Sequence, residues 1–128
     1  MTYRNIRRGW YERDGEKICY CKSGWERSYC AYLDWLVSLG EIVSWEYEPV
    51  EFEYHEVKRG TRYYIPDFRV MNQDGTHEWH EVKGRWTQKA RTQVSRFRKY
   101  YPEEKLVVID RDAYNAIKAK SNLIPNWE

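Results

Sequence analysis

Apolar residues recur at helical intervals in three segments of the chain, which predicts helices over about 23–40, 87–101 and 110–120. Ser23 and Glu26 have the spacing of a capping box, which favours a helix start at this point. The expected apolar stripes consist of Cys30, Leu33, Leu36, Val37 and Leu39, then Ala90, Val94, Phe97 and Tyr101, then Ala113, Tyr114 and Ile117.

Short runs of β-branched and aromatic residues lie between these segments and predict strands. The runs cover 42–47, 50–57, 61–71, 76–83 and 106–109. The last run is wholly apolar, so we expect it at the buried centre of a sheet. The order helix, strands, helix, strand, helix predicts an α/β fold in which a mixed central β-sheet is flanked by helices on both faces.

The length of 128 residues is that of a single domain with one core. The 7 Trp and 12 Tyr indicate a folded chain with an aromatic core, because disordered chains are poor in aromatic residues. We expect an N-terminal arm or short irregular strand over 1–22, the main core over 23–109, and a C-terminal helix with a loose tail over 110–128. No apolar run reaches the roughly 18 residues of a membrane span, so we expect no membrane association.

The three cysteines of the chain are Cys19, Cys21 and Cys30. One residue separates Cys19 from Cys21, which is not the spacing of a zinc knuckle, and no fourth ligand follows nearby. We therefore expect reduced, buried thiols rather than a zinc site. Such thiols fit a reducing, cytoplasmic compartment, which for a phage protein is the host cytoplasm.

Charge is unevenly distributed, although the formal net charge is only +2. Residues 41–56 hold six acids and no Lys or Arg, whereas residues 83–99 hold seven bases and no acid. We interpret the acidic segment as a solvated face. The aromatic residues Trp86, Tyr100 and Tyr101 border the basic segment, a combination typical of a surface that binds nucleic acid.

Two carboxylates and one amine are expected to converge where two of the strands pair. Glu81 and Lys83 point to one face of their strand, and the preceding strand brings Asp67 alongside Glu81. Two carboxylates hold a hard cation such as Mg²⁺, and the Val82 carbonyl can add a further oxygen ligand. Lys83 can orient a water or stabilise charge on a phosphate, so these residues predict metal-dependent phosphodiester chemistry.

Glu26 is a third candidate ligand, because it begins an inward-facing helical stripe and a buried carboxylate needs a partner. Simpler interpretations remain: Glu26 as a capping residue, Asp67 as a turn residue, and Glu81 with Lys83 as a solvated face. His80 points to the face opposite Glu81, so we expect a packed or hydrogen-bonded imidazole rather than a metal ligand.

Longer stretches around these residues carry a family resemblance. The landmarks are Gly24-Trp25-Glu26, Leu39-Gly40, Glu46-Tyr47-Glu48, Tyr64-Ile65-Pro66-Asp67-Phe68, Glu81-Val82-Lys83-Gly84 and Tyr101-Pro102 before the 106–109 strand. With them, the sequence resembles the PD-(D/E)XK nuclease superfamily, and most closely phage endonuclease I and the archaeal-type Holliday junction resolvases. The resemblance implies an active site of Glu26, Asp67, Glu81 and Lys83, with bound Mg²⁺ or Mn²⁺, phosphodiester hydrolysis and a homodimer.

The chain has little length beyond this core for reading base edges, which favours recognition of DNA shape and phosphates. A two-fold dimer presents two active sites at a fixed separation, which suits a branched DNA such as a four-way junction. The candidate DNA contacts are Arg7, Arg8, Lys58, Arg59, Arg62, Arg85, Trp86, Lys89 and Arg91. No small-molecule cofactor is expected. The alternatives are the same chemistry on duplex, nicked or single-stranded DNA, and a DNA-binding module without catalysis.

Overall fold

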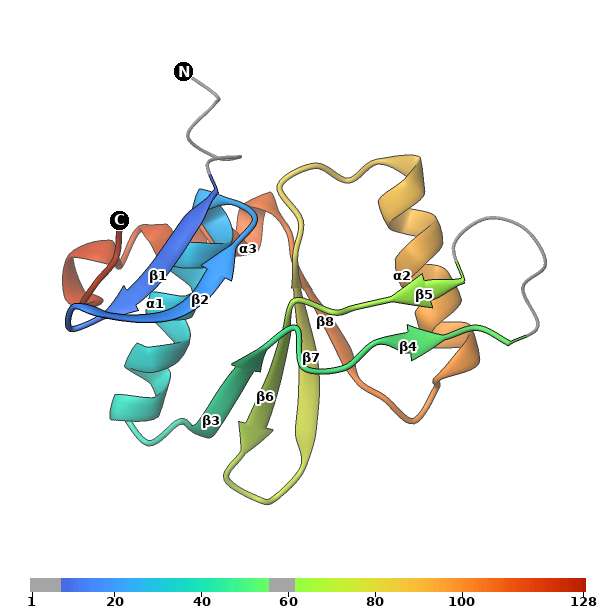
Figure 1. Cartoon of the computed structure of the whole chain (residues 1–128), viewed down its shortest axis with the longest axis horizontal. Helices are drawn as coiled ribbons and strands as arrows, with labels where there is room; N and C mark the ends of the chain where they lie inside the picture. Colours follow the sequence, from blue (N-terminus) through green and yellow to red (C-terminus); the bar gives the residue numbers. More distant parts are fainter. Residues whose placement is uncertain (1–7, 56–61) are drawn as a thin grey trace.

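A four-stranded mixed sheet forms the centre of the molecule (Figure 1). The structure, a computed structural model, describes residues 8–55 and 62–128. In sheet order the strands are β3 (Ile42–Tyr47), β6 (Phe68–Asn72), β7 (His77–Val82) and β8 (Leu106–Ile109). Strand β6 pairs antiparallel with β3 and with β7, whereas β8 pairs parallel with β7.

Helices cover both faces of this sheet, as the sequence predicts. In Figure 1, α1 (Gly24–Ser38) and α3 (Arg111–Lys118) lie on one side of the sheet, and α2 (Gln88–Tyr100) lies on the other. Each helix begins where a side chain accepts a hydrogen bond from the first turn. The three N-cap residues are Ser23, Thr87 and Asp110.

Two aromatic cores fill the spaces between the sheet and its helices. On the α1 face, Tyr29 packs on Phe68 with ring centroids 5.3 Å apart. On the α2 face, Phe52 packs on Phe97 at 4.9 Å, and Trp79 joins them. Residues of β7 alternate between the two cores, so each face of the strand is buried.

Residues 9–21 form a regular two-stranded hairpin, where the sequence predicts an arm or a short irregular strand. Strands β1 (Gly9–Arg13) and β2 (Glu16–Cys21) pair antiparallel around Asp14 and Gly15. Both turn residues have positive φ angles, 51° and 86°, which suits a tight hairpin turn that favours glycine. The hairpin packs against α1, so it belongs to the folded body of the protein.

The expected strands at 50–57 and 61–71 are much shorter in the structure. In the described part of these segments, Phe52–Glu53 (β4) and Tyr63–Tyr64 (β5) pair in a separate two-stranded ribbon that packs beside α2, and the later part of the second segment forms β6. The chain then leaves the ribbon before β6, at Pro66, which lacks the amide hydrogen that a sheet needs. The expected turn at 58–60 lies outside the described residues.

Strand β8 lies at an edge of the sheet, not at its centre. Leu106 and Ile109 are nevertheless buried, because helices cover the strand on both faces. The tail is also ordered rather than loose: a 3₁₀ turn over Ser121–Leu123 precedes Ile124, which is 4% exposed. Within the ranges that the structure describes, no helix is long and apolar enough to cross a membrane.

Candidate active site

Asp67 and Glu81 lie side by side at the point where β6 and β7 meet, as the sequence predicts. The backbone amide of Asp67 donates a 3.0 Å hydrogen bond to Oε1 of Glu81. In the opposite direction, the amide of Val82 donates a 2.8 Å bond to Oδ2 of Asp67. Both carboxylates are buried, so backbone amides replace part of their lost hydration.

Lys83 and Glu26 extend this pair. Nζ of Lys83 lies 3.1 Å from Oε2 of Glu81, which agrees with their expected position on one face of the strand. Glu26 is buried at the start of α1, and its Oε1 accepts hydrogen bonds from the Tyr47 hydroxyl at 2.6 Å and from the Lys22 amide at 3.2 Å. Its own amide is capped by Ser23 at 3.2 Å. The capping position and the inward-facing carboxylate therefore coexist in one residue.

Two charged residues at this site were missed by sequence reasoning. Nζ of Lys22 lies 2.7 Å from Oε2 of Glu48 and 3.7 Å from Oδ1 of Asp67. Lys22 fell within the expected arm, where no contact with the core was foreseen. Glu48 fell within the acidic segment interpreted as solvated, yet its amide donates a 2.8 Å bond to the Asp67 carbonyl. Its φ of 46° is unusual for a residue other than glycine and marks a sharp bend beside the site.

Burial raises the pKa of the Asp67 carboxyl well above its usual range, and the negative charges of Glu81 and Glu26 raise it further. The charge of Lys22 and the Val82 amide oppose this shift without cancelling it. Burial also raises the pKa of Glu26, against the hydrogen bond from Tyr47. These acids are crowded and poorly hydrated, so a bound cation would favour their ionised forms.

The donor set fits a hard divalent cation. Oδ1 of Asp67 and Oε2 of Glu81 face the amines of Lys22 and Lys83 and take no part in the backbone bonds. Carboxylate oxygens are the ligands that Mg²⁺ prefers, with waters completing its shell. Across the described ranges, Glu26, Asp67 and Glu81 do not form a group whose ligand atoms all lie within 4.8 Å of one another. Asp67 and Glu81 thus form the carboxylate pair, and Glu26 stays a candidate third ligand whose charge acts on Asp67.

Tyr64 contributes a further polar group to the site. Its hydroxyl is buried and lies near the Glu81 carboxylate. Burial raises the pKa of this phenol, and the nearby Glu81 charge raises it further. The Tyr64 phenol therefore places a protonated hydroxyl next to the Glu81 carboxylate.

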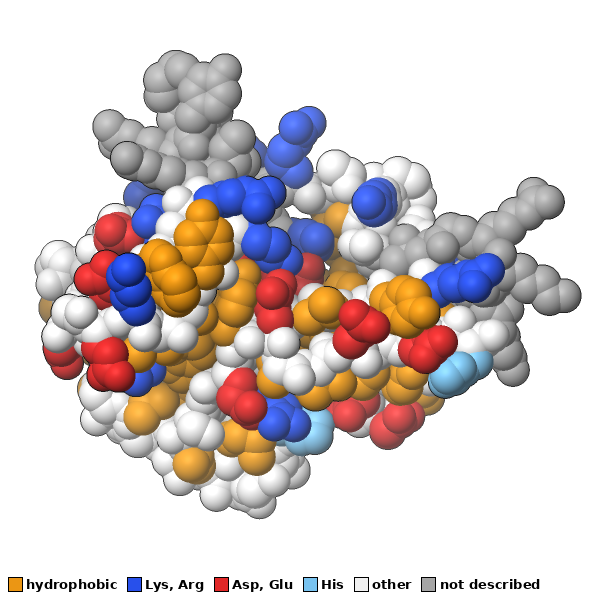
Figure 2. All heavy atoms as spheres, viewed as in Figure 1, with side chains coloured by type: hydrophobic (Ala, Val, Ile, Leu, Met, Phe, Trp, Pro, Cys, Tyr) orange, Lys and Arg blue, Asp and Glu red, His pale blue; other side chains and the backbone are white. Residues whose placement is uncertain are grey.

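The candidate DNA contacts that the structure describes are exposed: Arg8, Arg62, Arg85, Trp86, Lys89 and Arg91. Arg7, Lys58 and Arg59 lie outside the described residues. A pocket of about 420 Å³ extends from Lys83 past Arg85 and Trp86. Trp86 is 39% exposed and carries the Arg91 guanidinium over its ring at 5.3 Å, so it is not a core residue. In Figure 2, basic side chains gather around a hollow at the top of the molecule, with acidic side chains at its base.

His80 occupies the opposite face of β7, as expected. Its Nδ1 lies 2.6 Å from the Tyr29 hydroxyl, and its Nε2 lies 2.8 Å from Oε1 of Glu78. Burial lowers the pKa of the imidazole, against the effect of Glu78. The residue is a hydrogen-bonded part of the core.

Comparison with known proteins places the chain in a family. A family model described as a protein of unknown function, DUF1064, matches residues 15–116. The chain belongs to the DUF1064 family. The match runs from the β1–β2 turn into α3, so in this DUF1064 protein it covers the acidic site, the basic helix and all three cysteines. No curated protein matches the sequence.

Proposed function

We propose that the protein is a metal-dependent, structure-selective DNA endonuclease that resolves four-way junctions by phosphodiester hydrolysis. One observation carries this proposal: the Asp67 amide donates to the Glu81 carboxylate, the Val82 amide donates to the Asp67 carboxylate, and Lys83 lies 3.1 Å from Glu81. The sequence resemblance to PD-(D/E)XK nucleases assigns its active site to these same residues and to Glu26. Burying these acids destabilises the fold. A catalytic role explains why the protein nevertheless has them at this position.

Asp67 and Glu81 would hold Mg²⁺, or Mn²⁺ in its place, with the Val82 carbonyl as a candidate third ligand. When bound, the cation lowers the pKa of a water and neutralises charge on the phosphate. Lys83 is placed to orient the attacking water and to stabilise negative charge that develops on the phosphate oxygens. Glu26, held by Tyr47, would accept hydrogen bonds from waters around the cation.

Branched DNA is the substrate that the surface supports best. Arg85 of the loop before α2 and Arg111 of α3 line the same pocket as Lys83, so a phosphate backbone can reach the site without a deep cleft. Among the described helices and strands, none stands apart from the folded body as a separate element for reading bases. A homodimer would place two sites on one junction, which allows two symmetric cuts.

A cleavage assay with labelled four-way junction, nicked duplex and linear duplex tests the proposal, with and without Mg²⁺. We expect Mg²⁺-dependent cutting of the junction in preference to both duplexes. Equal cutting of linear duplex would leave the nuclease chemistry but remove the junction assignment. Binding without cutting under Mg²⁺ and Mn²⁺ would show a DNA-binding module instead.

Variants show whether cutting comes from the assigned site rather than from a contaminating nuclease, and whether a loss of cutting reflects misfolding. Asp67→Asn and Lys83→Ala should lose cutting by at least about a hundredfold while junction binding persists. Glu103→Gln is the matched control, because Glu103 is an exposed acid away from the site and its change should leave cutting intact. Full activity of Asp67→Asn would remove the assigned site.

A further inference from the structure

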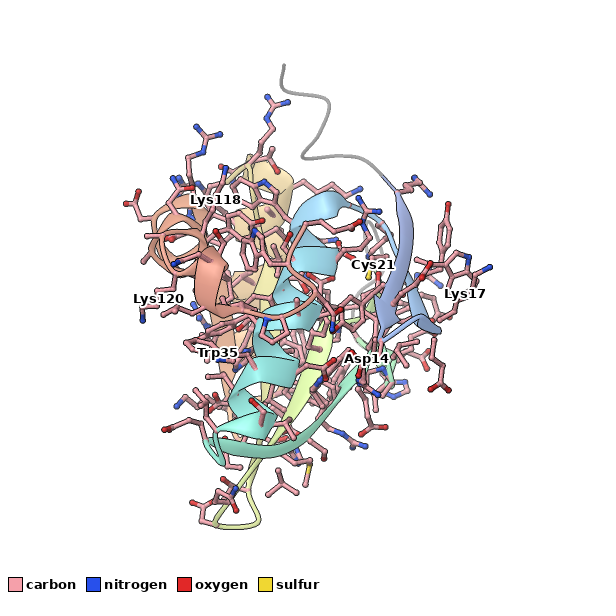
Figure 3. All side chains as sticks on the ribbon, turned by 90° about the vertical axis from the view of Figure 1, so that its left-hand side faces the viewer. Asp14, Lys17, Cys21, Trp35, Lys118 and Lys120 are labelled. Carbon is pink, nitrogen blue, oxygen red and sulfur yellow. The ribbon has the colours of Figure 1, made fainter. Side chains whose placement is uncertain are left out.

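All three cysteines of the chain meet beneath the β1–β2 hairpin. Cys19 and Cys21 come from β2, and Cys30 comes from α1. The Sγ atom of Cys19 lies 3.8 Å from that of Cys21 and 3.8 Å from that of Cys30, and the Cys21 and Cys30 sulfurs are 3.7 Å apart. Figure 3 shows Cys21 between the hairpin and α1. The thiols are free and form a nearly equilateral triangle.

The spacing of the cysteines along the sequence favours packed thiols over a zinc site, but their arrangement in space supports a different interpretation. We propose that Cys19, Cys21 and Cys30 form a thiolate site for Zn²⁺. Zinc binds cysteine sulfur at about 2.3 Å in tetrahedral geometry, which sets its sulfur ligands about 3.8 Å apart. The three observed separations agree with that value. Thiolates are soft ligands that select Zn²⁺ over Mg²⁺, so this site is chemically distinct from the carboxylates of the candidate active site.

The fold supplies three ligands and leaves a fourth position for a water. Cys21 and Cys30 are fully buried, whereas Cys19 is partly exposed and provides the side from which solvent can enter. In the described part of the chain, no His, Asp or Glu joins the three sulfurs within 4.8 Å. Three thiolates on Zn²⁺ leave one net negative charge. Near Cys19, the positive charge of Arg13 favours the thiolate, and its ion-pair partner Asp34 opposes it.

Zinc at this position would fasten the hairpin to α1. Lys22 directly follows Cys21, and Glu26 precedes Cys30 by about one helical turn. The metal would therefore fix both elements that carry these residues toward Asp67. The inference stands on the sulfur geometry and does not require the proposed nuclease function. The competing explanation is that three thiols pack as small apolar groups, which predicts no metal binding.

Metal titration of the full chain tests the site. Metal-free protein in a non-thiol reductant is titrated with Co²⁺ and then with Zn²⁺. We expect the intense thiolate-to-cobalt charge-transfer band of a tetrahedral site, saturating at one ion per chain and removed by one equivalent of Zn²⁺. Absence of this band together with absence of retained Zn²⁺ would overturn the proposal. Retention of Cu⁺ but not of Zn²⁺ would overturn the zinc assignment.

Two variants locate the bound metal. Cys19→Ser should weaken Zn²⁺ binding by at least about tenfold, and Cys19 is chosen because it is the least buried of the three. Asp67→Asn should keep the full thiolate-to-cobalt band and its displacement by Zn²⁺, since it changes only the carboxylate site. If circular dichroism shows that Cys19→Ser is unfolded, the rate of cysteine alkylation in the parent protein tests the site instead. Zn²⁺ must then slow thiol modification, and equal rates with and without it would overturn the proposal.

Discussion

The ammonium group of Lys22 lies 3.7 Å from Oδ1 of Asp67. A divalent cation on that oxygen would be repelled by this charge, so Lys22 and the metal compete electrostatically. We predict that Lys22→Gln binds Mg²⁺ about fivefold more tightly, a difference of about 1 kcal/mol, and is less stable than the parent without metal. Thermal unfolding at increasing Mg²⁺ concentration measures both effects.

Lys17→Gln is the control for Lys22→Gln, because Lys17 lies on β2, the strand that Lys22 directly follows, and points to solvent (Figure 3). It removes the same charge from β2 at a distance from the acids, so its Mg²⁺ response should match that of the parent. Equal Mg²⁺ stabilisation of Lys22→Gln and the parent would show that Lys22 does not oppose the cation.

Asp67→Asn is predicted to stabilise the metal-free protein while it removes the response to Mg²⁺. The amide oxygen can still accept the Val82 hydrogen bond, but the buried negative charge beside Glu81 and Glu26 is gone. We expect the free energy of unfolding at neutral pH to rise by about 1–2 kcal/mol in a chelator. Urea denaturation in chelator and in Mg²⁺ provides the measurement. A less stable variant in chelator would show that the charged carboxylate holds the site together.

The local parts of this fold could be predicted from the sequence. Ser23 and Asp110 cap their helices as expected, because a cap depends only on residues a few positions away. The pairing of Asp67 with Glu81 could also be predicted, since a short turn after β6 fixes the register of β7.

The distant parts could not be predicted, because they depend on packing between remote segments. Tyr11 is the one buried residue of β1, so the alternation of apolar and polar residues is too weak to predict the strand. Without the hairpin, the position of Lys22 beside Asp67 could not be predicted either. The edge position of β8 was missed because an edge strand covered by helices on both faces is as apolar as a central strand. The two cases give the same sequence pattern. The approach of Cys30 to Cys19 likewise requires the hairpin to fold onto α1.

Asp34 on α1 is predicted to make the stability of the hairpin depend on pH. Its carboxylate accepts hydrogen bonds from Tyr11 at 2.6 Å, Arg13 at 2.8 Å and Trp45 at 2.8 Å. These bonds hold the pKa of Asp34 below its ordinary value of 3.8, although burial acts in the opposite direction. A depressed folded pKa stabilises the protein above pH 3.8, and this contribution is lost as the pH falls through the folded value.

Asp34→Ala should lower the free energy of unfolding at pH 7 by about 2–3 kcal/mol, because it leaves the Tyr11 and Trp45 donors without their acceptor. Asp34→Asn should lose less, since its amide oxygen still accepts one bond. Thermal unfolding of each variant from pH 7 to pH 3 gives the pH dependence. The difference in stability between the parent and Asp34→Asn should become smaller toward pH 3. A difference that stays constant would assign the effect to packing rather than to charge.

Lys89 and Arg91 are predicted to contact DNA phosphates from α2. Replacing each with alanine should reduce the slope of log affinity against log salt by about 1, because each contact releases roughly one counterion. Affinity should fall by a similar factor for junction and duplex, since phosphates carry no sequence information. Lys120→Ala is the control, because Lys120 is exposed beyond α3 on the other side of the sheet (Figure 3). Fluorescence anisotropy over a range of salt concentrations measures these slopes, and an unchanged slope for both α2 variants would place the DNA on a different face.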